Sequence, residues 1–274
     1  MRKLAIVTDS AADILPATAR KLGVRVAPMR INMGGDDLRD GVDVQIGPYL
    51  DQLGSLQQLP RTSMPSPTDF METYRSLAIQ GYTDILSIHL SRSLSSTIEI
   101  PRLLAGTMFN DVHIEVIDSR AASVAEGAMV LEAAAVAAAG GSIEEAAAKA
   151  LTIRDLIKIQ FVPKRLTNLV KGGRATVLQA FAASALSVKP VMSFNCKGEM
   201  QVVHKAHGMG RAADYMARSL ADQGQEQGEL IYFTLHTRAE KSVERLANAI
   251  GEHGAVSWCG GCATIGPCIA THVG

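Results

Sequence analysis

Short apolar runs alternate with amphipathic segments over the first 160 residues of the chain. The runs at 4–7, 84–90 and 114–117 are largely apolar over only a few residues, as expected for strands buried on both faces of a parallel sheet. The segments between them have a helical spacing of apolar residues, and most end at a glycine. Strands that alternate with helices predict a parallel sheet with helices on both faces.

The same pattern predicts the other elements of this half. One further strand is expected at 24–31, and the proline-containing stretch 61–67 reads as a stiff loop. Asp13 is expected to cap the first helix, Pro67 to occupy the first turn of the third, and Ser142 to open a capping box for the last. The helices are expected at 13–22, 48–53, 67–79, 97–108, 121–139 and 142–159.

After residue 160 the order of elements changes. Two strands are expected around a turn at 195–198, a third strand follows later, and the last twenty residues are strand-like in short stretches. The expected strands are 189–192, 200–205, 230–236, 255–258 and 269–272, and the expected helices are 174–186, 206–220 and 239–251. The chain is therefore expected to form a parallel α/β domain over 1–160 and an α+β domain over 161–274.

Polar residues follow three of the strands in the first half. Asp9 and Ser10 end the first strand, the stretch 91–96 follows the third, and Asp118 and Ser119 end the fourth. Because parallel strands bring their carboxyl ends to one edge of a sheet, these residues are expected to converge there, where such sheets bind ligands. Strand-end carboxylates also bond neighbouring loop N–H groups, and we expect that structural role for both aspartates.

The stretch after the third strand holds five hydroxyls within seven residues. It reads Ser91-Arg92-Ser93-Leu94-Ser95-Ser96-Thr97 and leads into a helix. The first N–H groups of a helix lack intrahelical partners, and the helix dipole is positive there, so a carboxylate or phosphate can be held without a dedicated cation. The competing interpretation is a serine-rich helix cap that binds nothing.

Composition excludes several classes of function. The chain of 274 residues has 47% hydrophobic and 4% aromatic residues, and its 27 basic residues balance its 27 acidic ones. A protein that binds phosphate backbones needs clustered Lys and Arg, so nucleic acid is not an expected partner. The start lacks the apolar stretch of a signal peptide, and no run of 18 apolar residues occurs. The expected location is the cytoplasm, without stable membrane insertion.

The cysteines predict neither a metal centre nor a cofactor. Cys259 and Cys262 have the spacing of metal or redox pairs, but zinc needs four ligands and no second pair or His-x-x-x-His follows. A redox pair is expected to open a helix near the start of a thioredoxin-like unit, whereas this pair lies close to the chain end. We interpret both as ordinary reduced thiols.

Six short segments, in order along almost the whole chain, resemble the DegV family. They are Ile6-Val7-Thr8-Asp9-Ser10-Ala11-Ala12, Thr62-Ser63-Met64-Pro65-Ser66-Pro67, Leu94-Ser95-Ser96-Thr97, Val116-Ile117-Asp118-Ser119, Gly172-Gly173-Arg174 and Gly266-Pro267-Cys268-Ile269-Ala270-Thr271-His272. Each segment alone is weak, but six in register are specific. The resemblance implies a two-domain DegV-like fold that binds a long-chain fatty acid such as palmitate between its domains.

The resemblance also implies roles for particular residues and for a partner. Thr62 and Ser95 would bind the carboxylate through their hydroxyls, His272 would lie nearby, and Arg174 would lie near the mouth of the site. Ser63 is a further candidate. Some family members are the non-catalytic acyl-binding partner of a fatty acid kinase, which phosphorylates the bound carboxylate. For each of these residues the competing interpretation is a cap, turn or salt-bridge role.

The chain departs from the family pattern at three places. Ser96, itself a candidate ligand contact, stands where the family usually has Gly, and Ala270 replaces the usual Gly before Thr-His. The segment 203–211 carries fewer Arg and Lys than is usual on the expected kinase-docking surface. This last departure bears on the kinase partner more than on the lipid.

A fatty acid suits the residues on chemical grounds. Burying about 14 methylenes at about 0.8 kcal/mol each gives roughly 11 kcal/mol before the costs of binding. The tail therefore supplies the affinity, and the head needs only orientation by hydroxyl and N–H groups. Such groups hold a carboxylate oxygen less tightly than the paired N–H groups of an arginine guanidinium would. A loosely held oxygen suits later phosphorylation of the carboxylate.

Three other functions compete with this interpretation. A serine hydrolase would use Ser95, His272 and an acid such as Asp118, but no Gly-x-Ser-x-Gly motif occurs. An enzyme related to dihydroxyacetone kinases would need a nucleotide-binding loop, and Gly-x-x-x-x-Gly-Lys-Ser/Thr is absent. A lipid sensor without a kinase partner needs no further motif.

Overall fold

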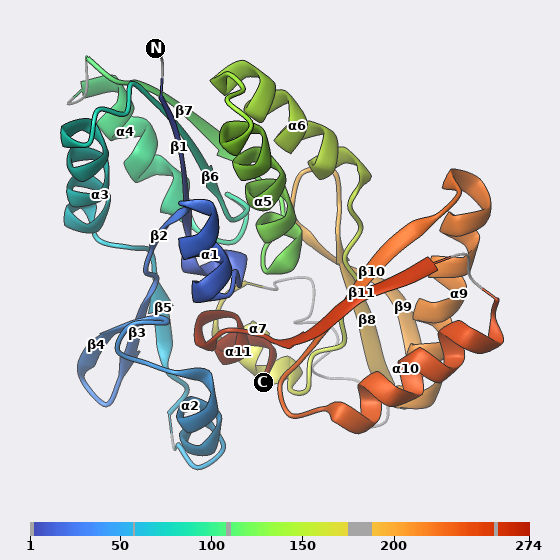
Figure 1. The fold of residues 1–274 in the computed structure, drawn as a ribbon. Coiled ribbons are helices and arrows are strands. Elements are labelled where there is room, and N and C mark those ends of the chain that lie inside the picture. The colour runs from blue at the N-terminus through green and yellow to red at the C-terminus, as the bar shows by residue number, and fades with distance from the viewer. Residues whose placement is uncertain (1–2, 57, 108–110, 175–187, 255–256) are drawn as a thin grey trace. The chain divides into compact units, whose positions relative to one another are not determined.

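The computed structural model describes residues 3–56, 58–107, 111–174, 188–254 and 257–274 (Figure 1). The helix expected at 174–186 therefore lies almost wholly outside the described residues. The chain divides into two compact units. Unit 1 comprises residues 1–159, 194–199 and 266–269, and unit 2 comprises residues 160–193, 200–265 and 270–274.

Unit 1 is built on a parallel sheet with the strand order β2-β1-β6-β7. The strands are β1 (Leu4–Asp9), β2 (Arg25–Ala27), β6 (Asp84–His89) and β7 (His113–Asp118). Val7 lies opposite Ser87, and His89 lies opposite Asp118. This register brings the carboxyl ends of β1, β6 and β7 to one edge of the sheet, as the sequence predicted.

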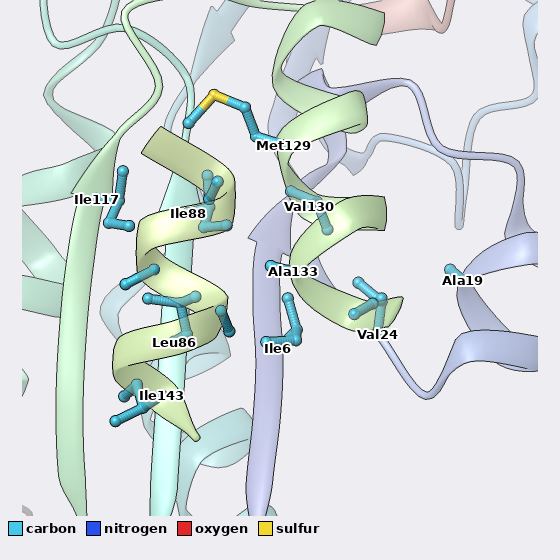
Figure 2. Packing of buried hydrophobic residues seen from close by; sticks show 14 residues of the cluster. Ile6, Ala19, Val24, Leu86, Ile88, Ile117, Met129, Val130, Ala133 and Ile143 are labelled. Atoms are coloured by element: carbon cyan, nitrogen blue, oxygen red, sulfur yellow. The ribbon is translucent and has the colours of Figure 1, made fainter. Parts of the chain in front are cut away.

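Helices cover both faces of this sheet, which confirms the predicted fold class. One face is covered by α1 (Pro16–Leu22), α5 (Val124–Ala138) and α6 (Ile143–Leu156), and the other by α3 (Pro67–Ile79) and α4 (Glu99–Thr107). Successive strand residues point to opposite faces. Ile6 accordingly packs with Leu86, Ile88 and the alanine-rich helices, as Figure 2 shows, whereas Val7 packs with Phe70.

Two predicted helix starts are confirmed in atomic detail. The Ser66 hydroxyl accepts from Asp69 N–H, and Asp69 accepts in return from Ser66 N–H, with Pro67 as the first residue of α3. Ser142 and Glu145 form the same reciprocal pair at the start of α6. Each box satisfies N–H groups that have no partner within the helix.

The prediction that Asp13 caps the first helix is wrong. Asp13 ends a short 3-10 turn, η1 (Ser10–Ala12), in the left-handed conformation with φ of 51°, and Leu15 precedes α1. The Asp13 carboxyl instead accepts hydrogen bonds from Ser123 O–H and from Gly266 N–H. Distant partners therefore determine the orientation of this side chain.

The strand expected at 24–31 is two strands in different sheets. Its first part is β2, and its second part begins β3 (Arg30–Met33). The latter forms an antiparallel sheet with β4 (Asp36–Arg39) and β5 (Arg61–Ser63), in the order β4-β3-β5. The helix α2 (Ile46–Leu53) packs on this sheet through Tyr49. The start of the expected stiff loop is thus a strand.

Unit 2 contains two pairs of strands and four described helices. β8 (Val188–Phe194), whose last residue belongs to unit 1, pairs with β9 (Met200–His207), and β10 (Leu230–His236) pairs in parallel with β11 (Ser257–Thr264). The helices are α7 (Leu166–Lys171), α9 (Met209–Gln227), α10 (Glu240–Glu252) and α11 (Pro267–Val273), whose first three residues belong to unit 1. Residues 269–272, expected as a strand, are helical because Pro267 opens α11. Within the described ranges no helix could cross a bilayer.

Candidate functional site

The first two hydroxyls of the cluster after β6 hold a turn. Ser91 Oγ donates to Gly198 O at 2.8 Å, and Ser93 Oγ donates to Lys197 O at 3.3 Å. Gly198 has φ of 76°, and a Cβ there would collide with Ser91 Oγ and lie 2.7 Å from Arg120 Cα. Both hydroxyls therefore serve the packing of the β8–β9 turn within unit 1.

Ser95 is placed differently. It precedes the 3-10 turn η2 (Ser96–Ile98) that leads into α4, yet its hydroxyl makes no capping bond to the helix. Ser95 Oγ lies 2.8 Å from Thr97 Oγ1, which also donates to Met29 Sδ at 3.8 Å. Ser95 is partly buried, whereas the next residue, Ser96, is exposed. Because the Ser95 hydroxyl does not cap the helix, it can bond other polar groups.

Thr62 also belongs to unit 1. It lies in β5 directly opposite Ile31 of β3, and it is partly buried, whereas Ser63 is exposed. Met29, which directly precedes β3, is the residue that Thr97 contacts.

The segment 266–269 also packs beside the hydroxyl loop. Cys268 and Ile269 share an apolar cluster with Leu90 and Leu94, which flank the serines. Gly266 N–H donates to Asp13 Oδ1 at 3.0 Å, and a Cβ on Gly266 would lie 2.6 Å from that oxygen. Only glycine fits at this position without displacing a buried carboxyl.

His272 and Arg174 come together in unit 2. A Cβ at Gly172 would lie 2.6 Å from His272 Nδ1, and Arg174 Nη1 donates to Gly172 O at 2.6 Å. Asn168 Nδ2 donates to Thr271 O at 3.2 Å and so fixes α11 on α7. Burial, with a further contribution from the Arg174 charge, lowers the pKa of His272 to about 4, so the imidazole is neutral at physiological pH.

The structure places Thr62 and Ser95 in unit 1 and His272 and Arg174 in unit 2, and it brings the latter two together around Gly172. Their contact with a ligand carboxylate stays a prediction. Asp118 Oδ1 accepts from Arg92 N–H and Arg120 N–H, which confirms its expected structural role. No group of three or more metal-ligating side chains occurs among the described residues.

Sequence reasoning missed a buried chain of polar groups across the sheet. Asp9 Oδ2 lies 3.0 Å from His89 Nδ1, His89 Nε2 lies 2.7 Å from Ser87 Oγ, and Ser87 Oγ lies 2.7 Å from Tyr74 OH. The order of groups is that of a hydrolase triad, but all four residues have 0% exposure. Because no substrate can reach these side chains, they cannot perform hydrolysis. We interpret this series of hydrogen bonds as structural. The sequence signal for this series was the pair of polar residues Ser87 and His89 at alternate positions of β6.

Buried carboxyls surround the end of β1. Asp13 accepts from Ser123 Oγ at 2.5 Å, Asp40 from Ser10 Oγ at 2.6 Å, and Glu126 from Thr8 Oγ1 at 3.1 Å. Burial raises the pKa of Asp13 to about 7 and that of Asp40 to about 6, and it raises the pKa of Glu126 well above its usual range. Neighbouring carboxylates, Asp9 among them, add to each shift. These groups anchor loops to the sheet edge.

Comparison of the sequence with known families and with individual proteins points to one family. A sequence model of the family described as "Uncharacterised protein, DegV family" matches residues 3–274. A DegV domain-containing protein of Clostridium perfringens is 32% identical over 231 residues, covering 84% of this chain and 82% of its own.

Solved structures agree with this match. A DegV family protein from Thermus thermophilus, described as binding fatty acid, has a TM-score of 0.89 at 29% identity and covers 100% of this chain and 96% of its own. A fatty-acid-binding DegV family protein from Streptococcus agalactiae has a TM-score of 0.88 at 26% identity, with the same coverage. The mixed α/β fold and its parallel sheet are those of these structures. The chain belongs to the DegV family.

Proposed function

We propose that this protein binds a long-chain fatty acid without catalysing its conversion, and that the hydroxyls of Thr62 and Ser95 together with His272 bind the carboxylate. The observation that carries the proposal is the Ser95 hydroxyl, which is partly buried at a helix start and is not used as its cap. The two similar solved proteins described as fatty-acid-binding support the choice of ligand.

The contacts of Ser95 suit an exchange of hydrogen-bond partners. Thr97 has one hydroxyl hydrogen and two acceptors within reach, Ser95 Oγ and Met29 Sδ. When Thr97 donates to Ser95, the Ser95 hydrogen is available to a carboxylate oxygen. A hydrogen bond to a charged group contributes about 1.5–3 kcal/mol. The site therefore needs only a rotation of two hydroxyls to accept the ligand.

His272 would contribute a neutral N–H donor. Its pKa of about 4 means that the ring carries one proton at physiological pH, and this proton can point toward a carboxylate. Arg174, bonded to Gly172 O beside the ring, supplies positive charge in the same corner of unit 2. The carboxylate would thus be held mainly by neutral donors, with one cation close by.

Presentation of the bound carboxylate to a fatty acid kinase is a finer proposal, and it rests on the family resemblance. In the segment 203–211, His204 stacks on Tyr215 with ring centroids 4.1 Å apart. The His204 imidazole therefore packs against Tyr215 within unit 2. A lipid carrier or sensor without a kinase partner is the alternative, and formation of acyl phosphate on addition of the kinase from a related bacterium would distinguish the two.

Mass spectrometry of an organic extract of the purified protein tests the ligand. We expect a co-purifying long-chain fatty acid and, after delipidation, saturable binding of palmitate. A lipid-free protein that also fails to bind added palmitate would overturn the proposal. Turnover of p-nitrophenyl esters that is lost in Ser95→Ala would favour the hydrolase instead.

A double variant tests the two hydroxyls. Thr62→Ala with Ser95→Ala removes both, and we expect palmitate affinity to fall by about a hundredfold or more, since each lost bond to a charged group costs about 1.5–3 kcal/mol. The matched control is Ser76→Ala with Thr152→Ala, which removes two hydroxyls from exposed helix positions of unit 1. Equal affinity in both double variants would exclude Thr62 and Ser95 from the site.

A further inference from the structure

An irregularity in β11 places two cysteines on one side of the strand. β10 and β11 pair in parallel, with Tyr232 opposite Cys259, but the next residue, Phe233, lies opposite Gly261, and Thr234 lies opposite Cys262. One extra residue, Gly260, is thus inserted into β11. Side chains three positions apart in a regular strand point to opposite faces. The inserted residue cancels this alternation and turns Cys259 and Cys262 to the same face.

The spacing of these two cysteines is within reach of a disulfide. They lie opposite Tyr232 and Thr234, which are two residues apart on a regular strand. Two residues of strand span about 6.6–6.8 Å, and the Cα atoms of disulfides are usually separated by about 4.4–6.8 Å. A small local contraction therefore brings the sulfurs into bonding distance.

The residues between the cysteines permit that contraction. Both are glycines, and Gly261 has φ of 146°, a conformation that residues with a Cβ rarely adopt. Cys259 Sγ already lies 3.8 Å from Gly261 O, on the side of Cys262. The backbone can adjust here without displacing a side chain between the two sulfurs.

Both thiols are accessible to reagents. Cys259 and Cys262 are exposed free cysteines, whereas Cys268 is buried. A dissolved oxidant can therefore approach either sulfur.

We propose that Cys259 and Cys262 are a redox-modification site that forms a reversible disulfide with a small-molecule disulfide as the oxidant. One cysteine, as the thiolate, attacks a sulfur of the oxidant, forming a mixed disulfide and releasing one small thiol. The other cysteine then attacks the protein-bound sulfur, closing the bond and releasing the second small thiol. The protein loses two protons and two electrons, which reduce the oxidant to two thiols. The site is independent of the fatty-acid proposal.

Equilibration of the full chain with mixtures of reduced and oxidised glutathione tests whether Cys259 and Cys262 form this disulfide. After alkylation of free thiols, we expect Cys259 and Cys262 to be protected without added glutathione mass and fragmentation to place a bond between them, whereas exposed Cys196 can be protected only as a mixed glutathione disulfide. Tryptic cleavage alone does not resolve the bond, because no Lys or Arg follows Arg245 and Cys268 lies in the same peptide. Cys259→Ser should leave a mixed glutathione disulfide on Cys262 that does not close.

Two controls separate the proposed site from ordinary thiol oxidation. Cys196→Ser and Cys268→Ala should retain the bond, since neither residue takes part. The folded protein should close the bond at least tenfold more favourably than the chain in denaturant, because the β11 irregularity preorganises the pair. Equal closure in both states, or four alkylated cysteines in oxidising buffer, would overturn the proposal.

Discussion

Replacement of Asp13 by Asn should change how stability depends on pH. Asp13 is packed at the end of β1, where it accepts hydrogen bonds from Ser123 O–H and Gly266 N–H. Its pKa rises from 3.8 to about 7, chiefly because burial disfavours the charged form. An amide has the same shape as the protonated carboxyl and stays neutral at every pH, so Asp13→Asn mimics the form that the folded protein prefers.

The sign and size of the effect follow from proton linkage. Between pH 3.8 and about 7 the folded state binds this proton and the unfolded state does not, so the free energy of unfolding falls as pH rises through that window. At about 1.36 kcal/mol per pKa unit, a shift of roughly three units gives about 4 kcal/mol. Solvent screening makes this an upper bound, because Asp13 retains some exposed surface.

Urea denaturation from pH 4.5 to 8.5 measures the difference. We expect Asp13→Asn to exceed the wild type by about 1 kcal/mol near pH 4.5, where the unfolded carboxyl is already largely ionised, and by up to about 4 kcal/mol near pH 8. Asp40 and Glu126 titrate in the same direction and remain in both proteins, so only the difference between the two curves is diagnostic. Asp222→Asn, at an exposed position of α9, is the control. Parallel curves for wild type and Asp13→Asn would refute the reasoning.

Two further substitutions test contacts described above. Gly172→Ala, whose new Cβ would lie 2.6 Å from His272 Nδ1, should displace the imidazole and weaken palmitate binding about tenfold, the loss of one hydrogen bond to a carboxylate. Gly251→Ala on α10, where a Cβ meets nothing within 4 Å, should leave calorimetric affinity unchanged, and equal affinity in both variants would count against His272. Tyr74→Phe breaks the buried bond to Ser87 and should cost about 1–2 kcal/mol in urea denaturation, whereas no loss would show that Ser87 is satisfied without it.

The sequence predicted those parts of the fold that depend on near neighbours. The capping box of α6 joins Ser142 and Glu145, which are three positions apart, and the sequence predicted it; the start of α3 was predicted from Pro67 in its first turn. Asp13 could not be predicted in this way, because its partner Gly266 lies 253 residues further along the chain.

For the candidate site residues too, contacts between residues far apart in the sequence could not be predicted. The serine cluster singled out the loop after β6, but only coordinates reveal that Ser91 and Ser93 hold carbonyls of the β8–β9 turn while Ser95 contacts Thr97. The cysteine pair was interpreted as ordinary thiols because no further metal ligands follow it and because it does not open a helix of a thioredoxin-like unit. The inserted Gly260 is a feature of strand pairing, and strand pairing is not visible in one strand's own sequence.

The interleaving of the two units has a consequence for biosynthesis. Residues 266–269, near the end of the chain, supply the N–H partner of Asp13 and part of an apolar cluster of unit 1. A ribosome makes the sheet of unit 1 first, yet this unit cannot complete its packing until residues 266–269 have been made. The unit that begins first therefore waits for most of unit 2 to be synthesised, and truncated products that stop before Gly266 should be recognised by proteases as unfinished in both units.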